Sequence, residues 1–222
     1  ALSNKHIMVN NKKELELTTN NSLINNNIAN MLCGNTVREV ILMKDNSRTI
    51  GIGVVPIDNC HYVCYVESGS PASDAQIRFG DQIIRINSME TAGIESAKIL
   101  KHLKSLPPGP VSFLIRNRPL QKVYQLFKNE TNLIGIGVKY GCINSLVKDS
   151  SAARNGIPIN HKIIEINFQN VIGMSDSDII NILNKAKGEI YLGLMRNRDY
   201  KQLMSGVAKK RLSFMDHSFM SL

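Results

Sequence analysis

The chain has 222 residues, of which 43% are hydrophobic and 20% are charged, a globular rather than a disordered composition. This length suits one large domain or two domains of about 100 residues. The formal net charge of +9 favours an acidic partner, either nucleic acid or an anionic membrane surface. Nucleic acid is disfavoured, because aromatic residues make up only 5% of the chain and no aromatic RNA-binding motif appears.

Targeting signals and cysteines give information on the cellular compartment of the chain. No apolar run approaches the roughly 18 to 20 residues that a membrane-spanning helix needs, and no secretory signal pattern is visible. Since the first residue is Ala1 rather than Met, we expect a fragment or a processed chain. Four cysteines at irregular spacing favour a reducing compartment over a disulfide framework.

An internal repeat organises the chain. Residues 50–54 (IGIGV) are repeated unchanged at 134–138. Three further blocks are repeated with small changes and in the same order: 70–73 matches 150–153, 83–87 matches 163–167, and 114–118 matches 194–198. The offset is 84 residues for the first block and 80 for the others. A period of this size suits a small domain rather than a solenoid repeat, so we expect two copies of one domain.

The repeat sets the expected domain boundaries. We expect an Asn-rich flexible arm at 1–36, a first domain at 37–116, a linker at 117–121, a second domain at 122–197 and a basic tail at 198–222. The linker is too short for independent tumbling, which predicts a preferred orientation of the domains. The tail, with Lys209, Lys210 and Arg211, predicts either an amphipathic helix on a membrane surface or a segment packed on the second domain.

In chain order, each copy predicts the same elements. The expected strands are 38–43, 52–55, 62–66, 83–86 and 111–115 in the first copy, and 122–127, 136–139, 143–147, 163–166 and 190–195 in the second. A short helix should start at Ser70-Pro71, with Ser70 as N-cap, and its counterpart at Asp149 or Ser150. Amphipathic helices are expected at 96–103 and 176–183. This order predicts two mostly β, α+β domains, each a partly open β-barrel with two helices.

These residues resemble the PDZ domain family twice. Loops 49–52 and 133–136 keep the central Gly and the apolar neighbours of the family's Gly-Leu-Gly-Phe loop but lose its first Gly. The first copy also has the family's Ser-Pro-Ala and Phe-Gly-Asp turns, at 70–72 and 79–81. The second copy has Ala152-Ala153 and Asn155-Gly156 at the first of these places, but His161-Lys162 where Gly-Asp would stand.

Longer segments resemble the syntenin family of tandem-PDZ adaptors. They are residues 38–42, 147–156, 170–173 and 215–217, and the resemblance covers about residues 37–218. Residues 1–36 show no match to the N-terminal adaptor region of that family. The resemblance implies a scaffold that binds C-terminal peptides of transmembrane receptors, syndecan-like tails among them, with roles in receptor clustering and vesicle trafficking.

A PDZ groove adds a peptide's last residues to a sheet as an extra strand. In the carboxylate loops, Gly would be needed because a Cβ would crowd the anion and forbid the local dihedral angles. The first residue of the longer helix, Ser96 or Asp176, would read the third-from-last side chain, and neither matches the usual His, which implies degenerate specificity. The expected peptide-binding residues are Thr49, Ile50, Gly51, Ile52, Gly53, Val54, Ser96, Leu100 and Leu103, with Leu133, Ile134, Gly135, Ile136, Gly137, Val138, Asp176, Ile180 and Leu183 in the second copy.

The resemblance further implies binding of phosphatidylinositol bisphosphate, in agreement with the basic charge. The candidate lipid-binding residues are Arg48, Lys98, Lys101, Lys139 and Lys185, with Lys104 beside the first groove. The alternative is that these lysines form an ordinary solvated face. The implied location is cytoplasmic, peripheral at the inner face of the plasma membrane or endosomes. The C-terminal residues 220–222 form a further candidate PDZ ligand, which would allow self-association as a homodimer.

Three motifs that could indicate a cofactor, a metal site or catalysis fit the sequence less well than a PDZ adaptor does. Residues 135–141 imitate a dinucleotide-binding glycine loop, but strand-like residues follow instead of a helix. Cys60 and Cys64 on one strand would stand roughly 13 Å apart, too far to share a zinc ion. The five His are scattered and no nucleophile elbow is present. We therefore expect no enzyme activity, no cofactor and no metal site, with a chiefly lipid-binding module as the alternative function.

Overall fold

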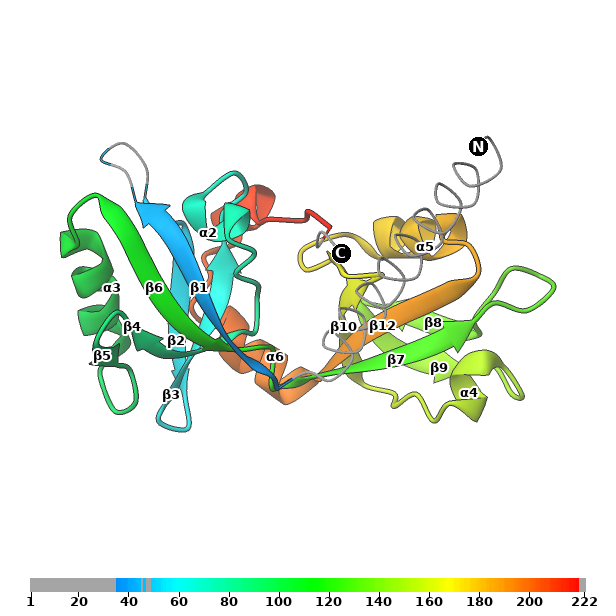
Figure 1. Cartoon of the computed structure of the whole chain (residues 1–222). Helices are drawn as coiled ribbons and strands as arrows, with labels where there is room; N and C mark the ends of the chain where they lie inside the picture. The colour runs from blue at the N-terminus through cyan, green and yellow to red at the C-terminus, as the bar shows by residue number, and fades with distance from the viewer. Residues whose placement is uncertain (1–34, 45, 47–48, 220–222) are drawn as a thin grey trace, which may run out of the picture. The chain divides into compact units, whose positions relative to one another are not determined.

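The first repeat forms an open six-stranded antiparallel sheet with two helices. The computed structural model describes residues 35–44, 46 and 49–219. The first-repeat elements are β1 (Val37–Lys44), β2 (Ile52–Ile57), β3 (Cys60–Val66), α2 (Pro71–Asp74), β4 (Gln82–Ile86), β5 (Met89–Glu90), α3 (Ser96–Ser105) and β6 (Gly109–Arg116). The strand order is β1-β6-β4-β3-β2, with β5 paired to β4, so β2 is an edge strand (Figure 1).

The second repeat has the same plan. Its elements are β7 (Gln121–Phe127), β8 (Ile136–Lys139), β9 (Cys142–Leu146), α4 (Ser151–Arg154), β10 (His161–Ile166), β11 (Gln169–Asn170), α5 (Asp176–Lys185) and β12 (Glu189–Arg196). The strand order is β7-β12-β10-β9-β8, with β11 paired to β10. The expected fold class, α+β with two helices in each domain, is confirmed, and both sheets are open rather than closed. The short strands β5 and β11 were not expected from the sequence.

Local chemistry explains the element boundaries. Ser70 caps α2 by accepting a hydrogen bond from the Ser73 amide, and Ser150, one of the two residues expected there, caps α4 through the Ala153 amide. Ser175 and Asp178 form a capping box at the start of α5. Pro56 lies within β2, where its missing N–H is tolerated because β2 is an edge strand.

Each sheet packs around its own apolar core. The first core brings together buried side chains from β1, β3, β4, β6 and α3, among them Phe113, Ile83 and Ile99. The second core is formed in the same way around Ile163 and Leu192. In both domains α3 or α5 packs along the strand at the edge, β2 or β8, which leaves a groove between helix and strand.

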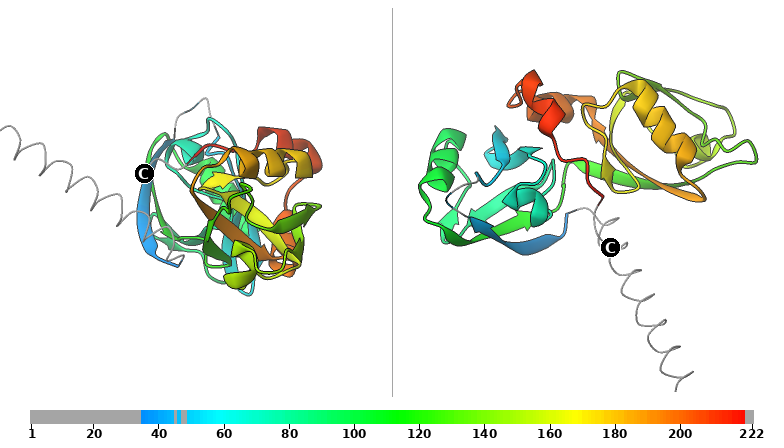
Figure 2. Two further views of the ribbon diagram at one scale, coloured as in Figure 1. Left: turned by 90° about the vertical axis from the view of Figure 1, so that its right-hand side faces the viewer. Right: turned by 90° about the horizontal axis from the view of Figure 1, so that it is seen from above.

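The C-terminal tail contacts both repeats. Its elements are α6 (Asn197–Met204) and the 3-10 helix η1 (Lys209–Phe214). A third apolar cluster joins tail residues Leu203 and Met215 to Tyr65 and Phe79 of the first repeat and to Ile172 of the second. Figure 2 shows this tail in orange and red beside the strands of both sheets. The tail therefore packs on the second domain, one of the two expectations, and on the first domain as well.

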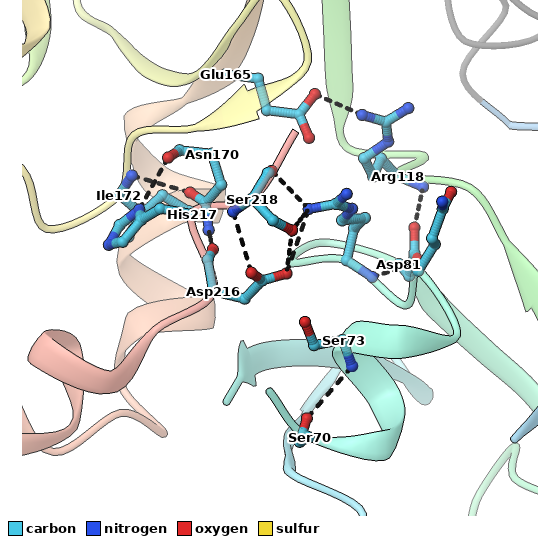
Figure 3. A network of polar contacts seen from close by, with 12 residues as sticks. Ser70, Ser73, Asp81, Arg118, Glu165, Asn170, Ile172, Asp216, His217 and Ser218 are labelled. Atoms are coloured by element: carbon cyan, nitrogen blue, oxygen red, sulfur yellow. Dashed lines mark hydrogen bonds and ion pairs between the residues drawn. The ribbon is translucent and has the colours of Figure 1, made fainter. Parts of the chain in front are cut away.

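Buried ion pairs accompany this apolar cluster (Figure 3). Arg78 of the first repeat pairs with Asp216 of the tail at 3.3 Å, with both side chains buried. The backbone carbonyl of Asp216 accepts a hydrogen bond from the Asn170 side chain of the second repeat. Arg118, in the segment between the repeats, pairs with Glu165 of β10, and its backbone amide donates to Asp81. These contacts tie the first repeat, the connecting segment, the second repeat and the tail together.

The buried carboxylate of Asp81 is stabilised by hydrogen bonds and an ion pair. Its carboxylate accepts hydrogen bonds from the Arg78 and Arg118 amides and pairs with Arg38 at 3.3 Å. Burial raises the pKa of Asp81, although Arg38 and Arg118 oppose the rise. The Asp81 side chain therefore has a structural role at its turn.

Candidate peptide-binding grooves

The first groove lies between edge strand β2 and helix α3. It is a cavity of about 420 Å³. Eight of the nine residues expected from the sequence line it, Ser96 being the exception; they are Thr49, Ile50, Gly51, Ile52, Gly53, Val54, Leu100 and Leu103. The free edge of β2 can therefore pair with an added strand whose side chains enter an apolar cavity.

The loop before β2 presents unpaired amides at the end of this groove. The carbonyls of Ile50 and Gly51 accept hydrogen bonds from the amides of Ala72 and Glu67. Within the described part of the chain, the amides of Ile50 and Gly51 themselves donate no hydrogen bond. Two neighbouring amides of this kind can bind one carboxylate.

The second groove repeats this geometry on a smaller scale. It is a cavity of about 210 Å³ between β8 and α5. Eight of its nine expected residues line it, with Asp176 as the exception; they are Leu133, Ile134, Gly135, Ile136, Gly137, Val138, Ile180 and Leu183. The carbonyls of Ile134 and Gly135 are again the acceptors, here from Ala152 and Val147. Among the described residues the amides of Ile134 and Gly135 have no partner.

The loop glycines are required by packing against a helix cap. Gly51 has a φ of +82°, and a Cβ there would lie 2.2 Å from the Cβ of Ser70. Gly135 has a φ of +83°, and its Cβ would lie 2.1 Å from the Cβ of Ser150. From the sequence we expect a Cβ to crowd the bound anion, whereas in the structure the nearest atoms belong to the N-caps of α2 and α4. Any side chain at these positions would therefore displace the loop.

The two residues expected to read the third-from-last side chain lie outside both cavities. Asp176 accepts hydrogen bonds from the backbone amides of Tyr140 and Gly141, at 2.8 and 2.6 Å. Its carboxylate thereby holds the β8–β9 turn against α5. The Ser96 hydroxyl is buried and has no hydrogen-bond partner among the described residues. Their expected role as selectivity residues stays a prediction.

The expected lipid-binding residues are spread over several elements. Lys98 and Lys101 lie on α3, where Lys98 pairs with Glu95 at 3.4 Å. Lys185 is exposed near the end of α5, and the Lys139 ammonium lies over the Tyr140 ring. None of these four lines a groove, whereas Lys104 lines the first one. Arg48 lies outside the described residues, as do residues 1–34 and 220–222.

The first groove contains residues that the sequence did not indicate. Tyr65 lies near the end of β3, Glu67 directly follows this strand, and Gly206 and Arg211 come from the tail. The Arg211 guanidinium lies 5.5 Å from the centre of the Tyr65 ring. The tail lies about 150 residues beyond this strand in the chain and shows no repeat or periodicity that points to the groove. Only the tertiary structure brings these residues together.

Comparison with known proteins places the architecture. The model of the PDZ domain matches residues 39–116 and again 124–195, which together cover most of the chain. The chain belongs to the PDZ domain family. The tail that completes the first groove lies beyond both matches.

The chain is also similar to the syntenins. It is 40% identical to human syntenin-1 over 183 residues, which cover 82% of this chain and 61% of the relative. It is 37% identical to rat syntenin-2 over 183 residues, 82% of this chain and 62% of the relative. The chain thus spans about three fifths of the length of these relatives. It is a tandem-PDZ chain resembling syntenin, as the sequence indicated.

A solved PDZ structure is similar at lower identity. The structure described as "Complex structure of INAD PDZ45 and NORPA CC-PBM" is 15% identical, covers 74% of this chain and 93% of its own, and has a TM-score of 0.38.

Among the described residues, no helix is long and apolar enough to span a bilayer. No group of three or more His, Cys, Asp or Glu in that part of the chain could hold a metal ion.

Proposed function

We propose that this PDZ chain is a non-enzymatic adaptor that binds the C-terminal peptides of transmembrane proteins through its two grooves. The observation that carries the proposal is a pair of amides, Ile50 and Gly51, that have no partner among the described residues and lie at the end of an edge strand beside an apolar cavity. The same arrangement at Ile134 and Gly135 supports two binding sites in one chain. Main-chain pairing supplies affinity in such a mode, and the side-chain cavities supply selectivity.

Two grooves on one chain would favour clustered targets. When one tail of a paired receptor is bound, the second tail reaches the other groove at a raised effective concentration. Receptor clustering and vesicle trafficking at the inner face of the plasma membrane or endosomes are part of this proposal. They are supported by the similarity to the syntenins. Syndecan-like tails are the proposed ligand class, and C-terminal self-association as a homodimer is a further part.

The test uses a labelled peptide ending Phe-Tyr-Ala with a free carboxylate and the same peptide with an amidated end. Leu100→Glu would place a charge in the first groove and Ile180→Glu in the second, and both positions line their cavities without being fully buried. We expect saturable binding that amidation abolishes and that each variant removes from one groove, because a buried charge disfavours an apolar ligand side chain. Titration by fluorescence anisotropy measures this.

Two matched variants control for general effects of charge. Lys101→Glu on α3 and Asn181→Glu on α5 add a Glu next to each groove residue, at exposed positions that line neither cavity. Both should bind the peptide as the wild type does. Binding that is indifferent to amidation, or that survives both groove variants together, would contradict the proposal.

Membrane recruitment by phosphatidylinositol bisphosphate is the second part of the proposal and the alternative main function. The specific observation is that Lys98 and Lys101 are exposed on α3 and do not line the first groove, whereas Lys104, one further step along the same spacing, does line it. Basic residues near an anionic surface each contribute about 1 kcal/mol. The same helix can therefore face an anionic lipid while its groove holds a tail.

A further inference from the structure

The first groove is built from two parts of the chain. Most of its lining, Tyr65 and Glu67 included, comes from the first PDZ domain, and Gly206 and Arg211 come from the tail. The second groove has no such addition, since every residue that lines it belongs to the second PDZ domain. The two grooves therefore differ in chemistry although their loops are nearly identical.

The tail is held closely against the outer face of β2 and β3. A Cβ on Gly206 would lie 2.2 Å from Val55 and 3.2 Å from the Cys64 sulfur. The backbone of Ser68 donates to the Phe214 carbonyl, and that of Asp216 donates to the Val66 carbonyl. The η1 helix that carries Arg211 is therefore anchored to the first domain directly beside the groove.

Strand geometry determines which peptide residue faces Arg211. Successive side chains of a strand point to opposite faces, and residues directly opposite on paired strands share a face. Ile52 and Val54 pack with the first core, on the side of α3, so Gly53 belongs to the other face, where its strand partner is Tyr65. A peptide whose carboxylate meets the Ile50 and Gly51 amides places its last residue beside Ile52. Its penultimate residue then lies opposite Gly53.

Gly53 places no side chain between this residue and Tyr65, and a Cβ there would lie 3.1 Å from both the Cys64 sulfur and the Tyr65 Cβ. Neighbouring strands stand about 4.8 Å apart, so two strand spacings separate the penultimate residue from Tyr65. A long side chain at that position can pass over Gly53 toward the Tyr65 ring and the Arg211 guanidinium above it. Within the described chain, Arg211 forms no ion pair, and its side chain is exposed at the groove.

We propose that Arg211 is a specificity residue of the first groove and selects C-terminal peptides with Glu or Asp at the penultimate position. The proposal rests on the peptide-binding function given above and names the ligand class of one of its sites. Charge complementarity supports it, because the described residues that line this groove include three basic ones, Lys44, Lys104 and Arg211, and one acidic one, Glu67. Lys128 is the one charged residue among those lining the second groove, and its ammonium donates to the Asn184 and Ala186 carbonyls.

The opposing charge of Glu67 makes the sign of the preference testable. Glu67 and Arg211 both act on the Tyr65 hydroxyl, where burial and Glu67 raise the pKa and Arg211 lowers it. If Glu67 governed this side of the groove, a basic penultimate residue would bind best. If Arg211 governs it, an acidic residue binds best.

The experiment uses peptides ending Phe-Glu-Ala, Phe-Gln-Ala and Phe-Lys-Ala on the full chain carrying Ile180→Glu, which leaves only the first groove open. We expect the Glu peptide to bind about two to five times more tightly than the Gln peptide, as for an exposed ion pair. Arg211→Gln should abolish this ratio, and Arg211→Glu should make the Lys peptide the best ligand. The preference should weaken as salt is added.

Lys210→Gln is the matched control, since Lys210 is exposed on the same 3-10 helix and does not line the groove. It should keep the wild-type ratio. A Glu-to-Gln ratio that persists in Arg211→Gln, or a wild-type preference for the Lys peptide, would overturn the role of Arg211 and leave carboxylate-dependent binding intact. Absence of binding by all three peptides would overturn the peptide-binding function and the role of Arg211 together.

Discussion

At the residue scale, Gly51 and Gly135 are each required by the local backbone conformation and also line a groove. Each adopts a positive φ and lies against the Ser that caps the following short helix. In this position the loop carbonyls accept hydrogen bonds from the amides of the following segments, while the loop amides have no partner within the described part of the chain. A bound carboxylate would use groups that the fold has already oriented, which lowers the entropic cost of binding.

His61 is a second residue with a consequence for the molecule. It lies in β3 with 1% of its surface exposed, and neither ring nitrogen has a hydrogen-bond partner among the described residues. Burial lowers the pKa of His61 from the ordinary 6.5, and the backbone of Ile94 and Thr91 offsets only part of this. The folded protein therefore binds a proton at His61 less readily than the unfolded chain does.

The sign of the pH effect follows from this lowered pKa. Above about pH 6.5 His61 is neutral in the folded and in the unfolded protein, so it does not change the free energy of unfolding. Below it, the unfolded chain takes up the proton first, so stability falls until the pH reaches the lowered folded-state value. Comparing urea unfolding at pH 7.5 and 5.5, we expect the wild type to lose more stability than His61→Gln. Equal losses in the two proteins would show that His61 does not contribute.

At the element scale, helix α3 serves two surfaces. Leu100 and Leu103 close the groove, and the lysines at positions 98, 101 and 104 recur at a helical spacing along it. The sequence predicted this helix and its apolar positions because they follow a helical period. The capping residues of α5 were equally local and hold its N-terminus through a capping box.

The lipid proposal is tested on this element. The double variant Lys98→Glu with Lys101→Glu reverses two charges on α3 while leaving the residues that line the groove unchanged. At about 1 kcal/mol per basic residue, binding to vesicles containing phosphatidylinositol bisphosphate should weaken at least tenfold. Co-sedimentation with vesicles measures this, and the charge-conserving double variant with Arg at both positions is the control. Unchanged sedimentation of the Glu variant would exclude this face as the lipid site.

At the scale of the whole molecule, the tail and the connecting segment join the two PDZ domains. The third apolar cluster draws on both repeats and the tail, and Leu203 at its centre is fully buried. Arg118 and Glu165 pair across the connection, and Glu165 with Asp81 raises the pKa of Arg118 against the opposing effect of burial. The two PDZ domains are therefore not joined by a flexible linker alone.

The buried pair between Arg78 and Asp216 tests this coupling. Arg78→Met would leave the Asp216 carboxylate buried without its cation, which costs about 3 to 5 kcal/mol of folding free energy. We expect a single unfolding transition in the wild type and a lower midpoint in the variant, measured by urea denaturation followed by circular dichroism. Lys98→Met removes an exposed pair with Glu95 and should cost about 1 kcal/mol or less. Equal costs for the two variants would show that the Arg78 pair does not hold the tail.

The sequence by itself determined the features that depend on near neighbours. Two copies of one domain, their strands and helices, and most of the residues that line the two grooves could be predicted. The reason is that alternation, helical period, capping and a repeated motif are all recorded within a few residues. Ser96 and Asp176 were placed correctly on their helices, but their hydrogen-bonding surroundings depend on a turn or loop elsewhere in the domain.

Only the tertiary structure decided what the tail does. Arg211 and Gly206 line a groove of the first domain, and Asp216 pairs with Arg78 across 138 residues of sequence. Such contacts follow no period, because burial and charge pairing require proximity in space and not along the chain. The difference between the two grooves arises in this way, since nearly identical loops acquire different neighbours when the chain folds.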